Sequence, residues 1–108
     1  MIYYTSYHIN LFKNDIMDKL PSDFKIAIRI YRCNQRNEPT YFNKLVQDFE
    51  GKISRATVSK NLDQLLDLGI IAGDWQKSNN GKWIRTFKIT DDASSLISSL
   101  SKKYLDLE

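Results

Sequence analysis

Several residue types that build other classes of protein are scarce in these 108 residues. Cys33 is the only cysteine, which excludes an internal disulfide framework and a zinc site made of several thiolates, and fits a reducing compartment. His8 is the only histidine, so a two-histidine metal motif is excluded as well. No apolar run approaches the ~20 residues that cross a bilayer, and residues 1–10 lack the pattern of a signal peptide. We therefore expect a soluble, cytoplasmic protein with no metal, no cofactor and no membrane partner.

Glycine and proline are also few, with four and two copies, whereas 42% of the residues are hydrophobic and 12% are aromatic. This balance excludes a disordered or collagen-like chain. The length allows one modest core, so we expect a single domain over residues 1–108. Catalytic motifs are missing too: there is no glycine-rich phosphate loop, and His8 and Cys33 lie on separate elements without an acidic partner. The sequence does not predict an enzyme.

Basic residues are concentrated in two segments. Residues 51–62 contain three basic and no acidic side chains, and residues 75–90 contain four basic and no acidic ones. These two basic segments together carry a charge of +7. The net charge of the chain is +3, so the remaining residues carry −4. If the segments lie side by side, the molecule has a basic face that suits a polyanion. Chance segregation of charge on solvated faces is the alternative.

Hydrophobic residues at helical spacing predict five helices. Their expected ranges are 9–20, 23–33, 41–50, 55–68 and 91–104. A side chain able to cap a helix precedes four of them: Ser22, Thr40, Ser54 and Thr90. Two hydrophobic pairs have the spacing of contacts that fix the ends of helix 55–68: Ile53 with Val58, and Leu65 with Ile70. Gly69 supplies the left-handed position after this helix.

Residues 70–76 and 82–89 are rich in β-branched and aromatic side chains and flank the turn-forming residues 77–81, which predicts a β-hairpin. Two short helices joined by a tight turn and followed by a hairpin indicate a winged helix-turn-helix. The expected fold class is therefore mainly α with a small antiparallel β-hairpin (α+β). The hairpin is called the wing below. Trp75 and Trp83 flank its tip, and we expect them to form an aromatic pair that stiffens it, with base stacking as the alternative.

The run from Ile53 to Ile71 resembles the recognition helix and strand entry of MarR-type winged-helix transcription regulators. Residues 89–93, Ile-Thr-Asp-Asp-Ala, resemble the passage from the last strand to the C-terminal helix in such proteins. The likeness covers about residues 22–100, but the family's Asp-x-Arg wing element is incomplete, because Arg85 is present and position 83 is tryptophan. The resemblance implies a regulator that binds double-stranded DNA.

The outer face of helix 55–68 supports this expectation independently. Its N-terminal half is small, polar and basic, which suits insertion of that end into a major groove. The wing is within reach of the neighbouring backbone or minor groove. The side chains expected to contact DNA are Lys52, Ser54, Arg55, Ala56, Thr57, Ser59, Lys60, Asn61 and Gln64 around the helix, and Lys77, Asn79, Asn80, Lys82 and Arg85 in the wing.

Specific recognition by so small a module normally needs a symmetric dimer. We expect a homodimer through the terminal helices, within residues 1–20 and 91–108. Whether a small-molecule effector binds is left open, and its identity is unknown. A winged-helix protein-interaction module of a larger nucleic-acid machine is the main alternative, and an RNA-binding winged helix is a third. Cys33 is interpreted as a packing residue, with an oxidation sensor as the alternative.

Overall fold

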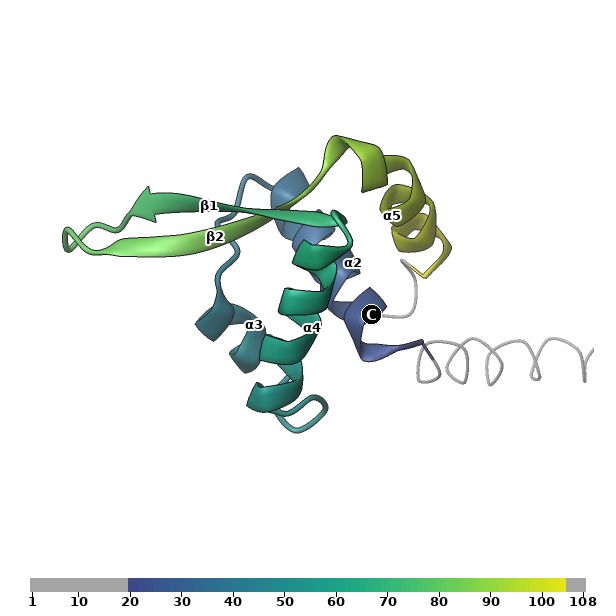
Figure 1. Cartoon of the computed structure of the whole chain (residues 1–108), viewed down its shortest axis with the longest axis horizontal. Coiled ribbons are helices and arrows are strands. Elements are labelled where there is room, and N and C mark those ends of the chain that lie inside the picture. Colours follow the sequence, from purple (N-terminus) through teal and green to yellow (C-terminus); the bar gives the residue numbers. More distant parts are fainter. Residues whose placement is uncertain (1–19, 105–108) are drawn as a thin grey trace, which may run out of the picture.

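The structure, a computed structural model, describes residues 20–104 (Figure 1). This part of the chain contains α2 (Ser22–Gln35), α3 (Phe42–Asp48), α4 (Arg55–Asp67), β1 (Ile71–Lys77), β2 (Trp83–Ile89) and α5 (Asp91–Lys103). The predicted helix over residues 9–20 falls almost wholly outside the described residues. The other four helices and the hairpin are confirmed, and the fold is an α+β winged helix-turn-helix.

Helix α2 is the centre of the core. Ile26, Ala27 and Ile30 are completely buried, because α4, α5 and the sheet all pack against this helix. Cys33 is 2% exposed near the end of α2, which agrees with its interpretation as a packing residue. The apolar face of α4 closes the other side of the core through Val58 and Leu65 among others.

Helix α5 lies on α2 and is tied to it by polar contacts. Arg32 donates from Nε to the Ser101 hydroxyl at 3.2 Å and from Nη2 to the Ser101 carbonyl at 3.3 Å. Three residues of the α5 apolar stripe, Ala93, Ile97 and Tyr104, are buried within the domain. Much of the stripe that we assigned to a partner chain is therefore used internally. Leu96, at 54% exposed, remains on the surface.

The ends of α4 form as the sequence predicts. The Ser54 hydroxyl accepts a hydrogen bond from the backbone N–H of Thr57, at 3.2 Å. Gly69 adopts φ +73°, and the N–H of Ile70 donates to the carbonyl of Leu65 at 3.0 Å, which is the Schellman arrangement. These two ends fix the length and direction of the helix between the turn and the hairpin.

The other three predicted capping side chains do not cap, and tertiary partners take the hydroxyls of two of them, Ser22 and Thr90. Ser22 is the first residue of α2, and its hydroxyl accepts from the amide of Asn61 at 2.6 Å. Thr40 is 1% exposed, and Tyr41 occupies the N-cap position of α3. Thr90 is at the N-cap position of α5, but its hydroxyl donates to the carbonyl of Gly69 at 2.6 Å. The predicted side-chain caps at Ser22, Thr40 and Thr90 are therefore wrong.

Strands β1 and β2 pair antiparallel, from Ile71 opposite Ile89 to Lys77 opposite Trp83. An isolated bridge between Tyr41 and Thr86 attaches the chain before α3 to the other edge of β2. The base of the hairpin is buried, whereas its outer half projects past α3 on the side away from α5 (Figure 1). The wing thus extends beside the helix-turn-helix and not over α5.

Candidate nucleic-acid interface

The N-terminal half of α4 presents short polar side chains to solvent. Ser54, Ala56, Ser59 and Lys60 are exposed, and Thr57 is half-buried. The Ser54 hydroxyl donates to the Thr57 hydroxyl at 2.9 Å in addition to capping the helix, so these two side chains are fixed together. Gln64, one turn beyond Lys60, is also exposed. Apart from the long side chains of Lys60 and Gln64, this surface consists of small residues, so a DNA groove can approach the helix closely.

Helix α3 positions the guanidinium of Arg55 at the start of α4. The Arg55 Nη2 atom donates to the Asn43 side-chain oxygen at 3.2 Å, and the guanidinium carbon lies 4.8 Å from the centre of the Phe42 ring. Lys52 is exposed in the turn between the two helices. In contrast, Lys44 Nζ donates to Glu38 Oε2 at 3.1 Å. This hydrogen bond raises the pKa of the Lys44 ammonium group. Arg55 and Lys52 therefore present charge beside the α4 N-terminus.

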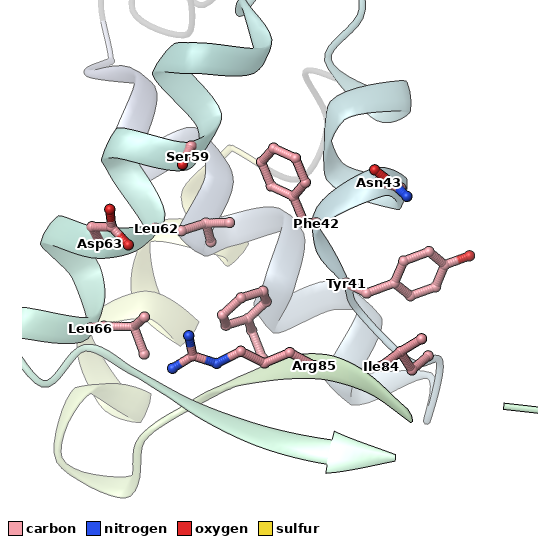
Figure 2. Close-up of a pocket in the computed structure, with 10 residues that line it drawn as sticks. Tyr41, Phe42, Asn43, Ser59, Leu62, Asp63, Leu66, Ile84 and Arg85 are labelled. Atoms are coloured by element: carbon pink, nitrogen blue, oxygen red, sulfur yellow. The ribbon is translucent and has the colours of Figure 1, made fainter. Parts of the chain in front are cut away.

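Arg85 lies flat across the wing. Its guanidinium carbon is 5.6 Å from the centre of the Phe87 ring, and a Cβ atom placed on Gly73 would come within 2.7 Å of its Nε atom. Because glycine has no Cβ atom, position 73 leaves room for the Arg85 side chain to cross β1. Figure 2 shows Arg85 running beneath Ser59 and Asp63 of α4, and all three residues line a concavity of about 350 Å³ bounded by α3, α4 and the wing. The concavity thus places Ser59 of the first basic segment near Arg85 of the second.

The tip of the wing is a hydrogen-bonded loop. The N–H of Ser78 donates to the carbonyl of Lys82 at 2.7 Å, and Gly81 has φ +83°. The Ser78 hydroxyl donates to the side-chain oxygen of Asn80. Four side chains predicted to contact DNA are exposed here: Lys77, Asn79, Asn80 and Lys82.

Asn61 is a correction to the predicted set. It is 6% exposed, and its amide nitrogen donates to the Ser22 hydroxyl at 2.6 Å, so it joins α4 to the first turn of α2. A DNA groove has no access to this amide. The signal was in the sequence, because positions 58, 61, 62 and 65 follow the spacing of one buried helix face.

We expect Asn61→Ala to destabilise the domain by about 1–3 kcal/mol, because the substitution leaves a small cavity and a Ser22 hydroxyl without its donor. Urea unfolding measures this loss. In a double-mutant cycle, Ser22→Ala made in the Asn61→Ala background should cost much less than in the wild type. Duplex affinity per folded molecule should be unchanged, and a specific loss of affinity would return Asn61 to the interface.

Sequence comparisons give no relative for this chain: no family model matches it, and no curated protein matches it. Its structure is similar to a PadR-like transcription factor from Bacteroides fragilis, with 16% identity and a TM-score of 0.56, over 94% of this chain and 91% of that one. It is also similar to a Streptococcus transcriptional regulator, with 19% identity and a TM-score of 0.60, over 90% of this chain and 88% of that one. A third similar structure is the transcriptional regulator SlyA, with 14% identity and a TM-score of 0.61, over 97% of this chain and 73% of that one. These likenesses establish the fold.

No helix in residues 20–104 is long and apolar enough to cross a membrane. No group of three or more histidine, cysteine or acidic side chains in the same residues is arranged to hold a metal ion.

Proposed function

We propose that this protein is a MarR-like transcription regulator that binds double-stranded DNA. The observation that carries the proposal is the meeting of α4 and the wing: Ser59, in the exposed polar N-terminal half of α4, and Arg85 of the wing line one concavity. The similar solved structures, two of them described as transcriptional regulators and one as a transcription factor, add to this support.

In the proposed complex the N-terminal end of α4 enters the major groove. Lys60 and Gln64 can donate to base edges, and Thr57 can contact a thymine methyl group. Asp63 and Asp67 are exposed in the C-terminal half, where their charges would repel phosphates and keep that end out of the groove. The wing then lies along the neighbouring backbone or minor groove, with Lys77 and Lys82 near phosphates.

We further propose that the regulator acts as a homodimer through its terminal helices. Leu96 gives α5 an exposed apolar side chain, and residues 1–19 supply a second apolar segment by sequence. A symmetric dimer would present two copies of α4 to two half-sites about one helical turn apart. An effector bound between the dimer helices would couple to their spacing.

The test is binding to random-sequence duplex at two salt concentrations. Affinity should fall with increasing salt, with a slope of about −0.9 in log–log form for each phosphate contacted. Sequences selected from a random pool should then form an inverted repeat, and an asymmetric consensus would refute the dimer. Absence of duplex binding even at low salt would overturn the proposal in favour of a protein-interaction module.

A further inference from the structure

The two tryptophans of this chain lie exposed on one face of the wing. Trp75 is 61% exposed and Trp83 is 64% exposed, and the sequence contains no other tryptophan. Trp75 is opposite Arg85 in the register and Trp83 is opposite Lys77. Directly opposed residues share a face, as do alternate residues of one strand, so the two indoles are diagonal neighbours on the same face.

This tryptophan face is the one turned toward α4. Arg85 belongs to it and lines the concavity together with Ser59 and Asp63 (Figure 2). The outer part of the face carries cations and no acidic side chain. The wing's acidic residue, Asp74, belongs to the opposite face, with Lys88. An anionic partner is therefore favoured on the tryptophan side.

The domain core does not need these indoles. The side chains that fill it from the wing, Ile71 and Phe87, are at the base of the hairpin, whereas both tryptophans are on the projecting outer half. Two large aromatic side chains kept in solvent expose area that a partner can bury. The partner that suits apolar rings interleaved with cations is one whose anionic groups alternate with apolar surface. A DNA backbone has this character, because phosphates alternate with deoxyriboses.

We propose that Trp75 and Trp83 pack against the deoxyriboses that wall the groove beside the site of α4, and so supply a salt-independent part of duplex affinity. This inference rests on the proposed function. Lysine contacts to phosphate release counterions and weaken as salt increases, whereas packing of an indole on a sugar releases water and leaves the salt slope unchanged. The two kinds of contact therefore differ in a measurable way.

The first experiment compares Trp75→Ala/Trp83→Ala with Lys60→Glu in duplex binding across a salt series. The tryptophan double variant should bind about 10- to 100-fold more weakly with the same salt slope. Lys60→Glu should weaken binding and also make the slope shallower. The matched variant Trp75→Phe/Trp83→Phe keeps apolar rings and should retain most of the affinity. Wild-type affinity in the double alanine variant would overturn the inference, while duplex binding sensitive to Lys60→Glu would leave the proposed function standing.

A second experiment needs no variant, because wing fluorescence is the only tryptophan emission of the chain. Saturating duplex should shift the emission to shorter wavelength and protect it from iodide quenching, measured at constant ionic strength. If duplex binds without changing the emission or the quenching, the inference is wrong. If single-stranded DNA of the same sequence protects the indoles better than duplex does, they stack on unpaired bases and the duplex contact is likewise refuted. If the wild type binds no duplex, the proposed function itself has failed.

Discussion

Exchanging Lys60 and Arg85 together for glutamate is expected to abolish duplex binding. Both side chains are exposed, Lys60 on the outer face of α4 and Arg85 in the concavity beside it. Each exchange removes a cation and places a carboxylate against phosphates, so the double variant should lose at least about 100-fold in affinity at physiological salt. The melting temperature should change by only a few degrees, because neither side chain is part of the core.

The matched control is Lys88→Glu/Lys102→Glu, which produces the same change in net charge. Lys88 is on the wing face opposite Arg85, and Lys102 is exposed on α5. This variant should lose only the long-range attraction, a few-fold at most in 0.15 M salt. Titration of labelled duplex by fluorescence anisotropy measures both variants. Equal losses in the two would show that affinity follows net charge alone, and the assigned face would be wrong.

Leu65→Ala is expected to have the largest effect on stability. Leu65 is 1% exposed in the core, and its carbonyl accepts the N–H of Ile70 in the Schellman ending of α4. Truncation removes buried apolar atoms and leaves a cavity, at a cost of about 2–5 kcal/mol. Domains of this size are stable by about 5–15 kcal/mol, so the loss is a large fraction of the total. We expect Tm to fall by roughly 10 °C or more.

Leu68→Ala makes the same chemical change three residues further along and serves as the control. Leu68 is 70% exposed at the C-terminal end of α4. Its truncation should change the free energy of unfolding by about 0.5 kcal/mol or less. Denaturant unfolding of both variants checks the pair, and similar losses at the two positions would contradict the burial assigned to α4.

The helices and the hairpin could be predicted from the sequence because their periodicity follows burial. In α4, Val58, Leu62 and Leu65 recur at helical spacing, and all three are buried. Gly69 supplied a backbone signal of the same local kind, since its left-handed conformation depends only on the end of its own helix. Features that depend only on near neighbours in the chain can be predicted from a single sequence.

Side-chain hydrogen bonds were harder to predict, because distant residues compete for them. The hydroxyl of Thr90 bonds Gly69, 21 positions away, in place of its own helix. The hydroxyl of Ser22 accepts from Asn61, 39 positions away, which also removes Asn61 from the candidate interface. Only the folded arrangement of α2 and α4 decides these pairings.

The candidate interface was predicted as a set of exposed polar residues, but its internal order was not. Arg85 was predicted from the sequence, but Gly73, the residue over which its guanidinium lies, was not. A lone glycine inside a strand is the signal that was available, since it often marks a close approach by another group. The division of α5 was not predicted either: Ala93 and Ile97 pack on the domain's own core, whereas Leu96 stays exposed.

In the proposed complex, the N-terminal half of α4 and the outer wing form a single DNA-binding face. Titration of the isotopically labelled protein with duplex, followed by backbone amide chemical shifts, tests it most directly. The largest shifts should fall in residues 54–60 and 77–85, and the shifts of α5 should change little. Largest shifts in α5, or on the wing face of Asp74 and Lys88, with residues 54–60 undisturbed, would contradict it.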